Sequence, residues 1–463
     1  MGIFIILVST GAGFTLPSLR MNRLGGNVTD ATFYAAEGLE AAKSIRYQGW
    51  TTPFLATSCS GGCGVSASSG FWAWNGVNNT KPPYTRAITV SSVGRDGSGN
   101  IVASGGTDDP NTKKVTSAVN WNFIAARPET ISLVTYVTNW VKSIIGNWGS
   151  VTQETCLDLT GAQDGRGVAT SGNYAYVVRN NTTNNFTVID ITTPATPSIS
   201  TTISLTGTPS NIAISGNYAF VTTDANAGEL VVVNITNPLV PTVAATLNIT
   251  GNNNANSLYI SGNFAYVVRA SGASNFNVVN ITTPTAPVVS GSLTLAGAGT
   301  DVFVMGNFAY VSSDDNAQEL QVVNVTTPAT PTAAGSLNLT GNSNALSITG
   351  FGTTVMVGRV DGTVAIVNVT TPATPTLLAT YTAGTLSVAR MTMIPTNSYL
   401  LLATFSGTQE FQSVLVTTLT SPTLGSAVNM ADNLTGVAYS QAKDRAIVTG
   451  INNTTEVCVM KPN

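Results

Sequence analysis

A repeat of 44 to 46 residues restricts the fold of this chain more than any other feature. The hexapeptide SGNYAY begins at residue 171, related hexapeptides begin at residues 215, 261 and 305, and a degenerate copy, TGFGTTVMV, begins at residue 349. A second, proline-containing marker follows each copy, at 192–197, 236–241, 282–287, 326–331 and 370–375. Each period holds four short runs of β-forming residues separated by Gly, Asn or Pro. Four strands in every 40 to 50 residues predict the blade of a β-propeller.

The number of copies predicts how the ring closes. Complete copies begin near residues 164, 208, 252, 298 and 342, and a diverged sixth copy begins near residue 385. The seventh copy ends after three strand-like runs. Its missing fourth run stands before the first copy, where ETCLDLTG (154–161) matches the ends of later copies such as AGSLNLTG. We therefore expect a seven-bladed propeller over residues 151–463, closed when strand 153–160 joins the last blade.

The four cysteines fit this arrangement as two disulfides. Cys156 and Cys458 fall on the fourth and third strands of the same predicted blade, so they become cross-strand neighbours. Cys59 and Cys63 enclose the flexible tripeptide SGG and are able to close a local loop. An even, small number of cysteines is typical of an oxidising compartment. The alternative is four unpaired, buried thiols.

Composition excludes several classes of function. The chain has no histidine, which removes the commonest general base and metal ligand. Its net charge of −3 gives no reason to expect a nucleic-acid partner. We therefore expect no enzyme activity, no cofactor and no metal site. Two loops containing Asp224, Asp314 and Asp315 allow weak calcium binding as an alternative, although turn formation explains their composition equally well.

The N-terminal third has a different character. The first nineteen residues carry no charge, and about twenty apolar residues suffice to cross a bilayer as a helix. A helical pattern follows over 30–46, with one apolar face. Segments 84–96, 101–105, 115–123 and 129–140 read as strands of a small antiparallel sheet. The face consists of small and aliphatic residues: Ala31, Ala35, Leu39, Ala42 and Ile45.

This part resembles a type IV pilin over roughly residues 1–145. The resemblance rests on the apolar N-terminal run with Pro17, followed by FYAAEGLEAAKSIR and GW. It implies a long pilin-like N-terminal α-helix over 1–47 and a pilin-like β head over 48–150. A helix of this kind sits first in the inner membrane and later in the core of an extracellular filament. The residues assigned to that core are Met1, Ile5, Pro17, Ala31, Ala35 and Leu39. The alternative is an amphipathic helix packed on its own domain.

The resemblance also implies the partners: copies of the chain and the type IV pilus assembly machinery. We expect a structural subunit of an extracellular, cell-surface filament, with the given sequence already processed at Met1. One departure is Ile5, which stands where the family usually has a glutamate. Minor pilins lack this glutamate more often, so the alternative is a minor or tip pilin that acts as an adhesin for surface glycans. An exported propeller enzyme is least favoured.

The repeats resemble those of LVIVD-repeat propellers, over about residues 151–463. The matching runs are FTVIDITTP, LVVVNITNP, NVVNITTP, LQVVNVTTP and VAIVNVTTP. This resemblance implies a propeller and little about its activity, because propellers host many unrelated functions. The complete expected fold is therefore mainly β, with a long helix and small antiparallel sheet ahead of a seven-bladed propeller.

Two sets of repeated residues are candidate sites. Arg179, Arg269 and Arg359 end the second strand of alternate blades, where they are candidates for glycan binding. The alternative is that they pair with acidic side chains of adjacent blades. Four Asn-x-Thr sequons recur with the repeat and are possible N-glycosylation sites: Asn234, Asn280, Asn324 and Asn368.

Overall fold

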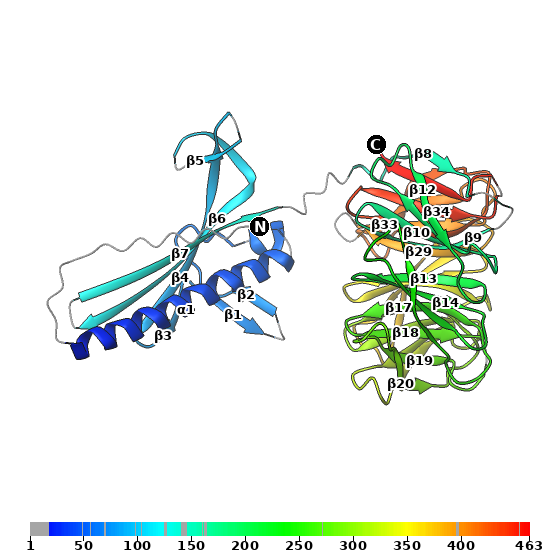
Figure 1. Ribbon diagram of the computed structural model, residues 1–463, viewed down its shortest axis with the longest axis horizontal. Helices are drawn as coiled ribbons and strands as arrows, with labels where there is room; N and C mark the ends of the chain where they lie inside the picture. Colours follow the sequence, from blue (N-terminus) through cyan, green and yellow to red (C-terminus); the bar gives the residue numbers. More distant parts are fainter. Residues whose placement is uncertain are drawn as a thin grey trace. The chain divides into compact units, whose positions relative to one another are not determined.

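The chain divides into two compact units, Met1–Ser143 and Ile144–Asn463. The computed structural model describes residues 18–463 except 49, 56, 69–70, 98, 103, 125–126, 140–145, 160, 162–163, 271, 395–397 and 453. Side chains of the helix are described from Asn27 onward. Figure 1 shows the elements of each unit, which are treated separately below.

The first unit is a helix laid on an antiparallel sheet. Helix α1 (Ser18–Gln48) is followed by a π-helical turn, η1 (Trp50–Phe54). The sheet has the order β3-β4-β6-β7, with the short β5 paired to β4, and a separate hairpin joins β1 to β2. The strands are β1 (Val65–Ser68), β2 (Phe71–Trp74), β3 (Asn79–Lys81), β4 (Tyr84–Arg95), β5 (Ile101–Val102), β6 (Thr107–Ile124) and β7 (Arg127–Thr138).

Helix α1 buries its small-residue face against β4, β6 and β7, across which it lies in Figure 1. Ala31, Ala35 and Leu39 are 0 %, 0 % and 8 % exposed and share a core with Ile88 of β4 and the valines of β6. Gly38 permits the close approach, because a Cβ there would lie 2.5 Å from Oγ of Ser117. Small residues on the helix thus bring its backbone close to its own sheet.

The expectation of a long N-terminal helix with a pilin-like sheet is wrong. The described chain is mainly β, and within it there is one short α-helix, whose side chains are described from Asn27 onward. The predicted core residues Met1, Ile5 and Pro17 lie outside the described residues. The rest of the predicted core, including Ala31 and Ala35, faces the sheet of its own unit. The physical reason is that β4, β6 and β7 supply the apolar surface that the helix needs, so the alternative of packing on its own domain holds.

The second unit contains seven four-stranded antiparallel sheets, all within the described residues. In chain order the first six sheets use consecutive strands. They are β9 (Gly165–Ser171), β10 (Tyr174–Arg179), β11 (Phe186–Asp190), β12 (Ser198–Ile203); β13 (Pro209–Ser215), β14 (Tyr218–Thr223), β15 (Leu230–Asn234), β16 (Thr242–Leu247); β17 (Ala255–Ser261), β18 (Phe264–Arg269), β19 (Phe276–Asn280), β20 (Val288–Leu293); β21 (Gly299–Met305), β22 (Phe308–Ser313), β23 (Leu320–Asn324), β24 (Thr332–Leu337); β25 (Ala345–Phe351), β26 (Thr354–Arg359), β27 (Thr363–Asn368), β28 (Thr376–Thr382); and β29 (Val388–Ile394), β30 (Tyr399–Thr404), β31 (Phe411–Leu415), β32 (Thr423–Val428).

The seventh sheet joins the two ends of the unit. Its strands are β33 (Leu434–Ser440), β34 (Arg445–Gly450), β35 (Val457–Pro462) and β8 (Val151–Leu157), and β8 pairs with β35. The first strands of all seven sheets contact one another in sequence, and β33 contacts β9, so the ring is closed. The segment before the first repeat therefore supplies the fourth strand of the last sheet, which is the pairing that the repeat count predicts.

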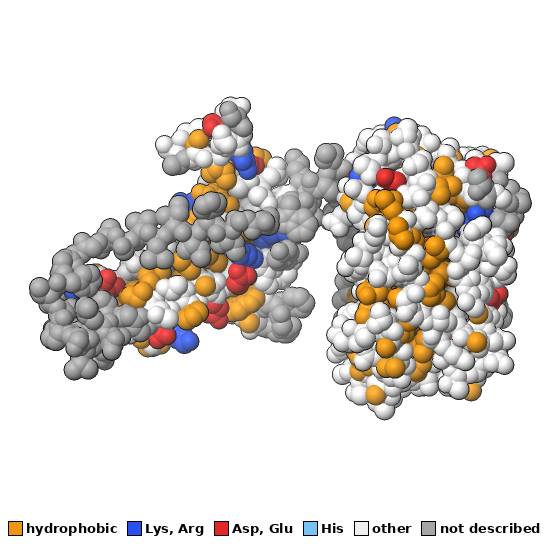
Figure 2. Space-filling model, viewed as in Figure 1, with side chains coloured by type: hydrophobic (Ala, Val, Ile, Leu, Met, Phe, Trp, Pro, Cys, Tyr) orange, Lys and Arg blue, Asp and Glu red, His pale blue; other side chains and the backbone are white. Residues whose placement is uncertain are grey.

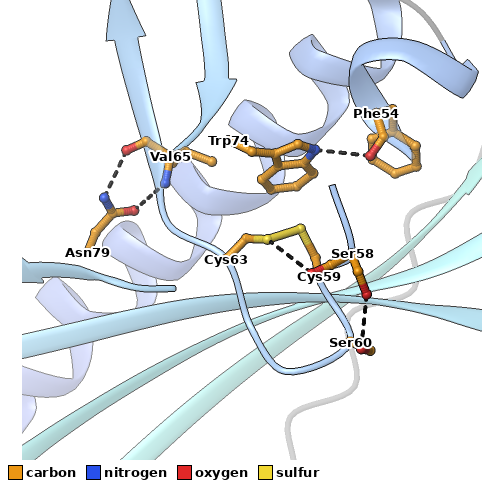
Figure 3. The surroundings of a disulfide bond; sticks show 8 residues. All are labelled: Phe54, Ser58, Cys59, Ser60, Cys63, Val65, Trp74 and Asn79. Atoms are coloured by element: carbon orange, nitrogen blue, oxygen red, sulfur yellow. Dashed lines mark hydrogen bonds between the residues drawn. A yellow bond between two sulfur atoms is a disulfide. The ribbon is translucent and has the colours of Figure 1, made fainter. Parts of the chain in front are cut away.

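Both predicted disulfides are present, and the described residues include no free cysteine. Cys156 and Cys458 are directly opposed in the β8–β35 register. Cys59–Cys63 closes a loop beside Trp74, whose indole N–H donates to the carbonyl oxygen of Phe54 at 3.0 Å (Figure 3). Each unit thus has one covalent link of its own.

Within the described residues, we find no helix with both the length and the apolar character needed to span a membrane.

Candidate functional site

The three repeated arginines lie inside the propeller unit rather than on its surface. Arg179, Arg269 and Arg359 are 2 %, 0 % and 4 % exposed. Arg269 donates to the carbonyl oxygens of Ile249, Thr250, Gly251 and Asn253, in the segment that connects the preceding sheet to its own. Arg179 donates to the carbonyl oxygen of Leu159 in the equivalent segment, at 3.0 Å. Side chains buried in this way offer no surface to a glycan.

Two of these arginines pair with buried glutamates of the preceding sheet. Nη2 of Arg179 lies 3.8 Å from Oε1 of Glu456, and Nη2 of Arg269 lies 3.6 Å from Oε1 of Glu229. Burial lowers the pKa of both guanidinium groups, and the neighbouring carboxylates oppose that shift. Arg359 instead lies 3.4 Å from Asp361 of its own sheet. Pairing across adjacent blades, the alternative given above, is therefore what two of the three arginines do.

The second and fourth sheets, whose second strands end in Thr223 and Ser313 instead of arginine, follow sheets that carry asparagine in place of glutamate. Oδ1 of Asn185 accepts from N of Leu205 at 2.7 Å, and its amide donates to the carbonyl oxygens of Leu205 and Gly207. Asn275 makes the same contacts with Leu295 and Gly297. One asparagine thus satisfies groups that otherwise need a glutamate from one blade and an arginine from the next.

The four sequon asparagines occupy the turn between the third and fourth strands. Oδ1 of Asn234 accepts from N of Thr236 at 2.9 Å, and Asn280, Asn324 and Asn368 make the same contact two residues on. Asp190, which is not a glycosylation acceptor, forms this turn in the first sheet with Thr192. Turn formation therefore accounts for the recurrence of these residues. Attached glycans stay a prediction.

A polar group gathers on the first strands, which form the innermost circle of the ring. Oγ of Ser257 donates to Oδ1 of Asp301 at 2.5 Å and accepts from Nδ2 of Asn211 at 2.6 Å. Nη1 of Arg390 lies 3.7 Å from Oδ2 of Asp301, although the two belong to the sixth and fourth sheets. We call Asn211, Ser257, Asp301 and Arg390 the inner ring. They occupy the same register position of their respective first strands.

The inner ring combines hydrogen-bonding groups with aromatic neighbours. The Arg390 side chain is 20 % exposed, and within the described part of the chain its Nε and Nη2 have no protein acceptor. Tyr259 and Phe303 follow Ser257 and Asp301 by two residues, which places them on the same strand face. Their rings meet edge to face with centroids 5.0 Å apart. This group was not identified from the sequence; the pattern that points to it is a polar residue at the same register position in successive repeats.

The acidic loops form turns. Oδ1 of Asp224 accepts from N of Thr208 at 2.6 Å, and Oδ1 of Asp314 accepts from N of Ala298 at 2.6 Å. Oδ1 of Asp315 accepts from N of Ala317. Within the described residues, no group of three or more His, Cys, Asp or Glu side chains is placed to hold a metal ion. Figure 2 shows that uncharged groups dominate the visible face of the propeller unit, with few charged side chains among them.

Comparison with known proteins agrees with the repeated sheets. The model of the LVIVD repeat matches residues 162–204, 206–248, 253–294 and 296–339. The chain contains LVIVD repeats. Among solved structures, it is similar to the WD40 β-propeller domain of Doa1, with 12 % identity, a TM-score of 0.51, and coverage of 68 % of this chain and 97 % of that one. This likeness shows a β-propeller-like fold alone.

A second solved structure, the computationally designed Ika8 protein, matches 66 % of this chain and 89 % of its own at 16 % identity and a TM-score of 0.47. No curated protein matches the chain. The match of the repeat model and the likeness to the Doa1 domain confirm the LVIVD repeats and the β-propeller-like fold.

Proposed function

We propose that the protein is a structural subunit of an extracellular filament, in which copies associate through the N-terminal part and display the LVIVD propeller outward. The observation that carries this proposal is the solvent face of α1. Phe33 is 71 % exposed and Val28 is 37 % exposed, on a helix that directly follows an uncharged, apolar leading segment. Exposed apolar side chains of this size mark surfaces that associate with a partner.

Other features support an extracellular setting. Both disulfides fit an oxidising compartment. The propeller closes on itself and has its own cores, so display does not require the first unit for folding. The resemblance of the N-terminal sequence to type IV pilins supports copies of the chain and the type IV pilus assembly machinery as partners, with insertion in the inner membrane before assembly.

The test is electron microscopy of filaments sheared from native cells, labelled with antibody against the propeller. We expect label at regular intervals along filaments. The test variant is Phe33→Ser. The control is Val77→Ser, at a loop residue that is 70 % exposed. Phe71→Ser is not a suitable control, because Phe71 lies in the β1–β2 hairpin. Filaments should be lost with the first change and kept with the second. Filaments that form normally without the protein would contradict the proposal.

A second candidate function is a minor or tip subunit that binds surface glycans. The buried arginines do not serve it, but the inner ring does, because aromatic rings beside hydrogen-bonding groups suit sugar recognition. Label at filament ends alone would favour this candidate. Glycan-array binding that is lost on Arg390→Met and kept on Arg166→Met, an exposed arginine of β9, would support the inner ring as the site.

A further inference from the structure

Four of the junctions between neighbouring sheets contain a buried glutamate just before a third strand. Glu229, Glu319, Glu410 and Glu456 are 0 %, 0 %, 1 % and 0 % exposed. In each, Oε2 accepts from a backbone N–H that follows the fourth strand of the same sheet, at 2.8 to 3.0 Å: N of Ile249, Leu339, Met430 and Leu159, respectively. The other oxygen, Oε1, remains for a partner from the next sheet.

In three of these junctions the next sheet contributes an arginine. Arg269, Arg359 and Arg179 end the second strand of the sheet that follows Glu229, Glu319 and Glu456. Their guanidinium groups fill the junction and donate to carbonyl oxygens of the connecting segment, as Arg269 does with Ile249 and Thr250. A buried cation thus accompanies the buried carboxylate at each of these places.

The fourth junction, between the sixth and seventh sheets, has a glycine at the position of the arginine. Gly450 pairs with Leu434 in the register in which Arg269 pairs with Ala255. The carboxylate of Asp432 occupies the space where a side chain of residue 450 would begin. This junction therefore contains two carboxylates, Glu410 and Asp432, where the others contain a carboxylate and a guanidinium.

Each of these carboxylates has one oxygen without a protein donor. Oδ1 of Asp432 accepts from N of Ile451 at 3.1 Å, whereas its Oδ2 is buried and has no hydrogen-bond partner. Oε2 of Glu410 accepts from N of Met430, and in the described part of the chain nothing donates to its Oε1. No ion pair of either residue occurs among the described residues.

We propose that the junction between the sixth and seventh sheets binds a hard divalent cation, of which Ca²⁺ is the best match, in place of the missing guanidinium. The available donors are carboxylate oxygens of Glu410 and Asp432 and the backbone carbonyls that follow β32. These carbonyls correspond to those that accept from Arg269 in the equivalent junction. Oxygen donors with two negative charges suit Ca²⁺, and the absence of histidine from the chain removes nitrogen ligands preferred by zinc.

The experiment is calorimetric titration of calcium chloride into chelator-treated, full-length protein at pH 7, with the unfolding temperature measured in parallel. We expect one saturable site with a dissociation constant on the order of 10⁻⁴ to 10⁻³ M, because only two carboxylates contribute. Calcium should raise the unfolding temperature of the second unit. Absence of saturable calcium binding would overturn the proposal.

Three variants assign the site. Glu410→Gln keeps the shape of the side chain and should weaken calcium binding about ten-fold or more. Asp314→Asn changes an exposed turn aspartate and should leave calcium binding unchanged. Binding that survives Glu410→Gln but is lost in Asp314→Asn would place the cation in the acidic loop and overturn the assignment.

The combination of Gly450→Arg with Asp432→Asn rebuilds the arginine junction, since Asn253 precedes the first strand at the place equivalent to Asp432. This variant should be as stable without calcium as the original is with it, and should no longer bind calcium. A rebuilt junction that still binds calcium would contradict the role of Asp432 and of the missing arginine. These readouts are independent of filament formation, so the proposed function and this inference fail separately.

Discussion

At the scale of single residues, the buried backbone groups at the junctions between blades find hydrogen-bond partners in two different ways. The chain that leaves a fourth strand presents a backbone N–H and several carbonyl oxygens inside the ring, and buried groups of this kind need partners. Asn185 and Asn275 supply donor and acceptor from one side chain. Glutamate supplies only the acceptor, so an arginine from the next blade supplies the donors. The alternation of arginines along the sequence follows from this division.

The first residue-scale prediction concerns Arg269. Its replacement in Arg269→Met leaves Glu229 as an unpaired buried charge and several carbonyls without donors. We expect the free energy of unfolding to fall by about 3–5 kcal/mol, measured by urea denaturation. Adding Glu229→Gln to Arg269→Met should recover part of this loss. A double variant no more stable than the single one would contradict an unpaired Glu229 carboxylate as the cause of the loss.

The second residue-scale prediction concerns pH. Asp109 accepts hydrogen bonds from Thr112 and from Arg95, the latter at 2.7 Å, and these hold its pKa at about 2, below its ordinary value of 3.8. A carboxyl group with a lowered pKa in the folded state contributes stability that is complete above its unfolded pKa and is lost as the pH falls toward the folded one. The first unit should therefore lose this contribution between pH 4 and pH 2.

The measurement is the free energy of unfolding of the original chain and of Asp109→Asn at several pH values. The difference between them should be constant above about pH 5 and should shrink toward zero near pH 2. Asp108→Asn, which changes an exposed neighbour on the same strand, is the control and should show no such trend. A difference that persists unchanged at pH 2 would assign the effect of Asp109→Asn to packing.

At the scale of elements, the proline-containing turns are packing devices as well as connections. The turn of one blade contacts the middle of the fourth strand of the preceding blade. A Cβ on Gly291 would lie 2.7 Å from the carbonyl oxygen of Ala329, and a Cβ on Gly335 would lie 2.8 Å from that of Ala373. Glycine at these strand positions is therefore required for close approach of the next turn, not for backbone flexibility.

This contact gives the element-scale prediction. Gly291→Ala forces the fourth strand and the neighbouring turn apart, so we expect a loss of about 1–3 kcal/mol in the free energy of unfolding. The control is Gly97→Ala, where the added Cβ meets nothing within 4 Å. Chemical denaturation of both variants measures the effect. Equal stability of the two variants would show that the turn shifts without cost.

The same elements show which parts of the fold are predictable from the sequence. Strands of the repeats are predictable because Gly, Asn and Pro punctuate them at fixed intervals, and hairpin β4–β5 is predictable from its Gly-rich turn. The apolar face of α1 is also predictable from spacing, as Ala31, Ala35 and Leu39 show. The surface that covers this face is not predictable in the same way, because the spacing of apolar residues identifies a buried face but not what packs against it. The sheet of the same unit covers it, so Ala31, Ala35 and Leu39 are buried within their own unit.

The two candidate sites differ in how far the sequence reveals them, for a similar reason. Arg179, Arg269 and Arg359 are conspicuous in sequence because they repeat, but whether a strand end faces solvent or the next blade depends on tertiary packing. The inner ring is the opposite case: Asp301 and Arg390 stand in repeats two blades apart, and only closure of the ring brings them within 3.7 Å. A group of residues that forms only when the ring closes cannot be recognised in the sequence of a single repeat.

At the scale of the whole molecule, ring closure depends on one blade shared between the two ends of the propeller unit. Strand β8 adds main-chain hydrogen bonds to β35, and Cys156–Cys458 links the same two strands across a sequence separation of 302 residues. Segment 146–150 reinforces the closure, because the indole N–H of Trp148 donates to Asp444 at 2.9 Å and N of Asn147 donates to the carbonyl oxygen of Asn463 at 3.0 Å. The ring is therefore closed by non-covalent contacts as well as by the disulfide.

The final prediction separates the covalent from the non-covalent part of this closure. Replacing both cysteines, in Cys156→Ser with Cys458→Ser, should preserve the far-ultraviolet circular dichroism, since the β8–β35 ladder remains. The free energy of unfolding of the second unit should fall by roughly 4–5 kcal/mol, because the disulfide restricts a very long loop in the unfolded chain. Calorimetry resolves the two units, and Cys59→Ala with Cys63→Ala is the control, whose effect should be confined to the first unit. Unfolding of the serine variant at the original temperature would contradict this prediction. The disulfide would then restrain only the local segment around the shared blade and not the whole ring.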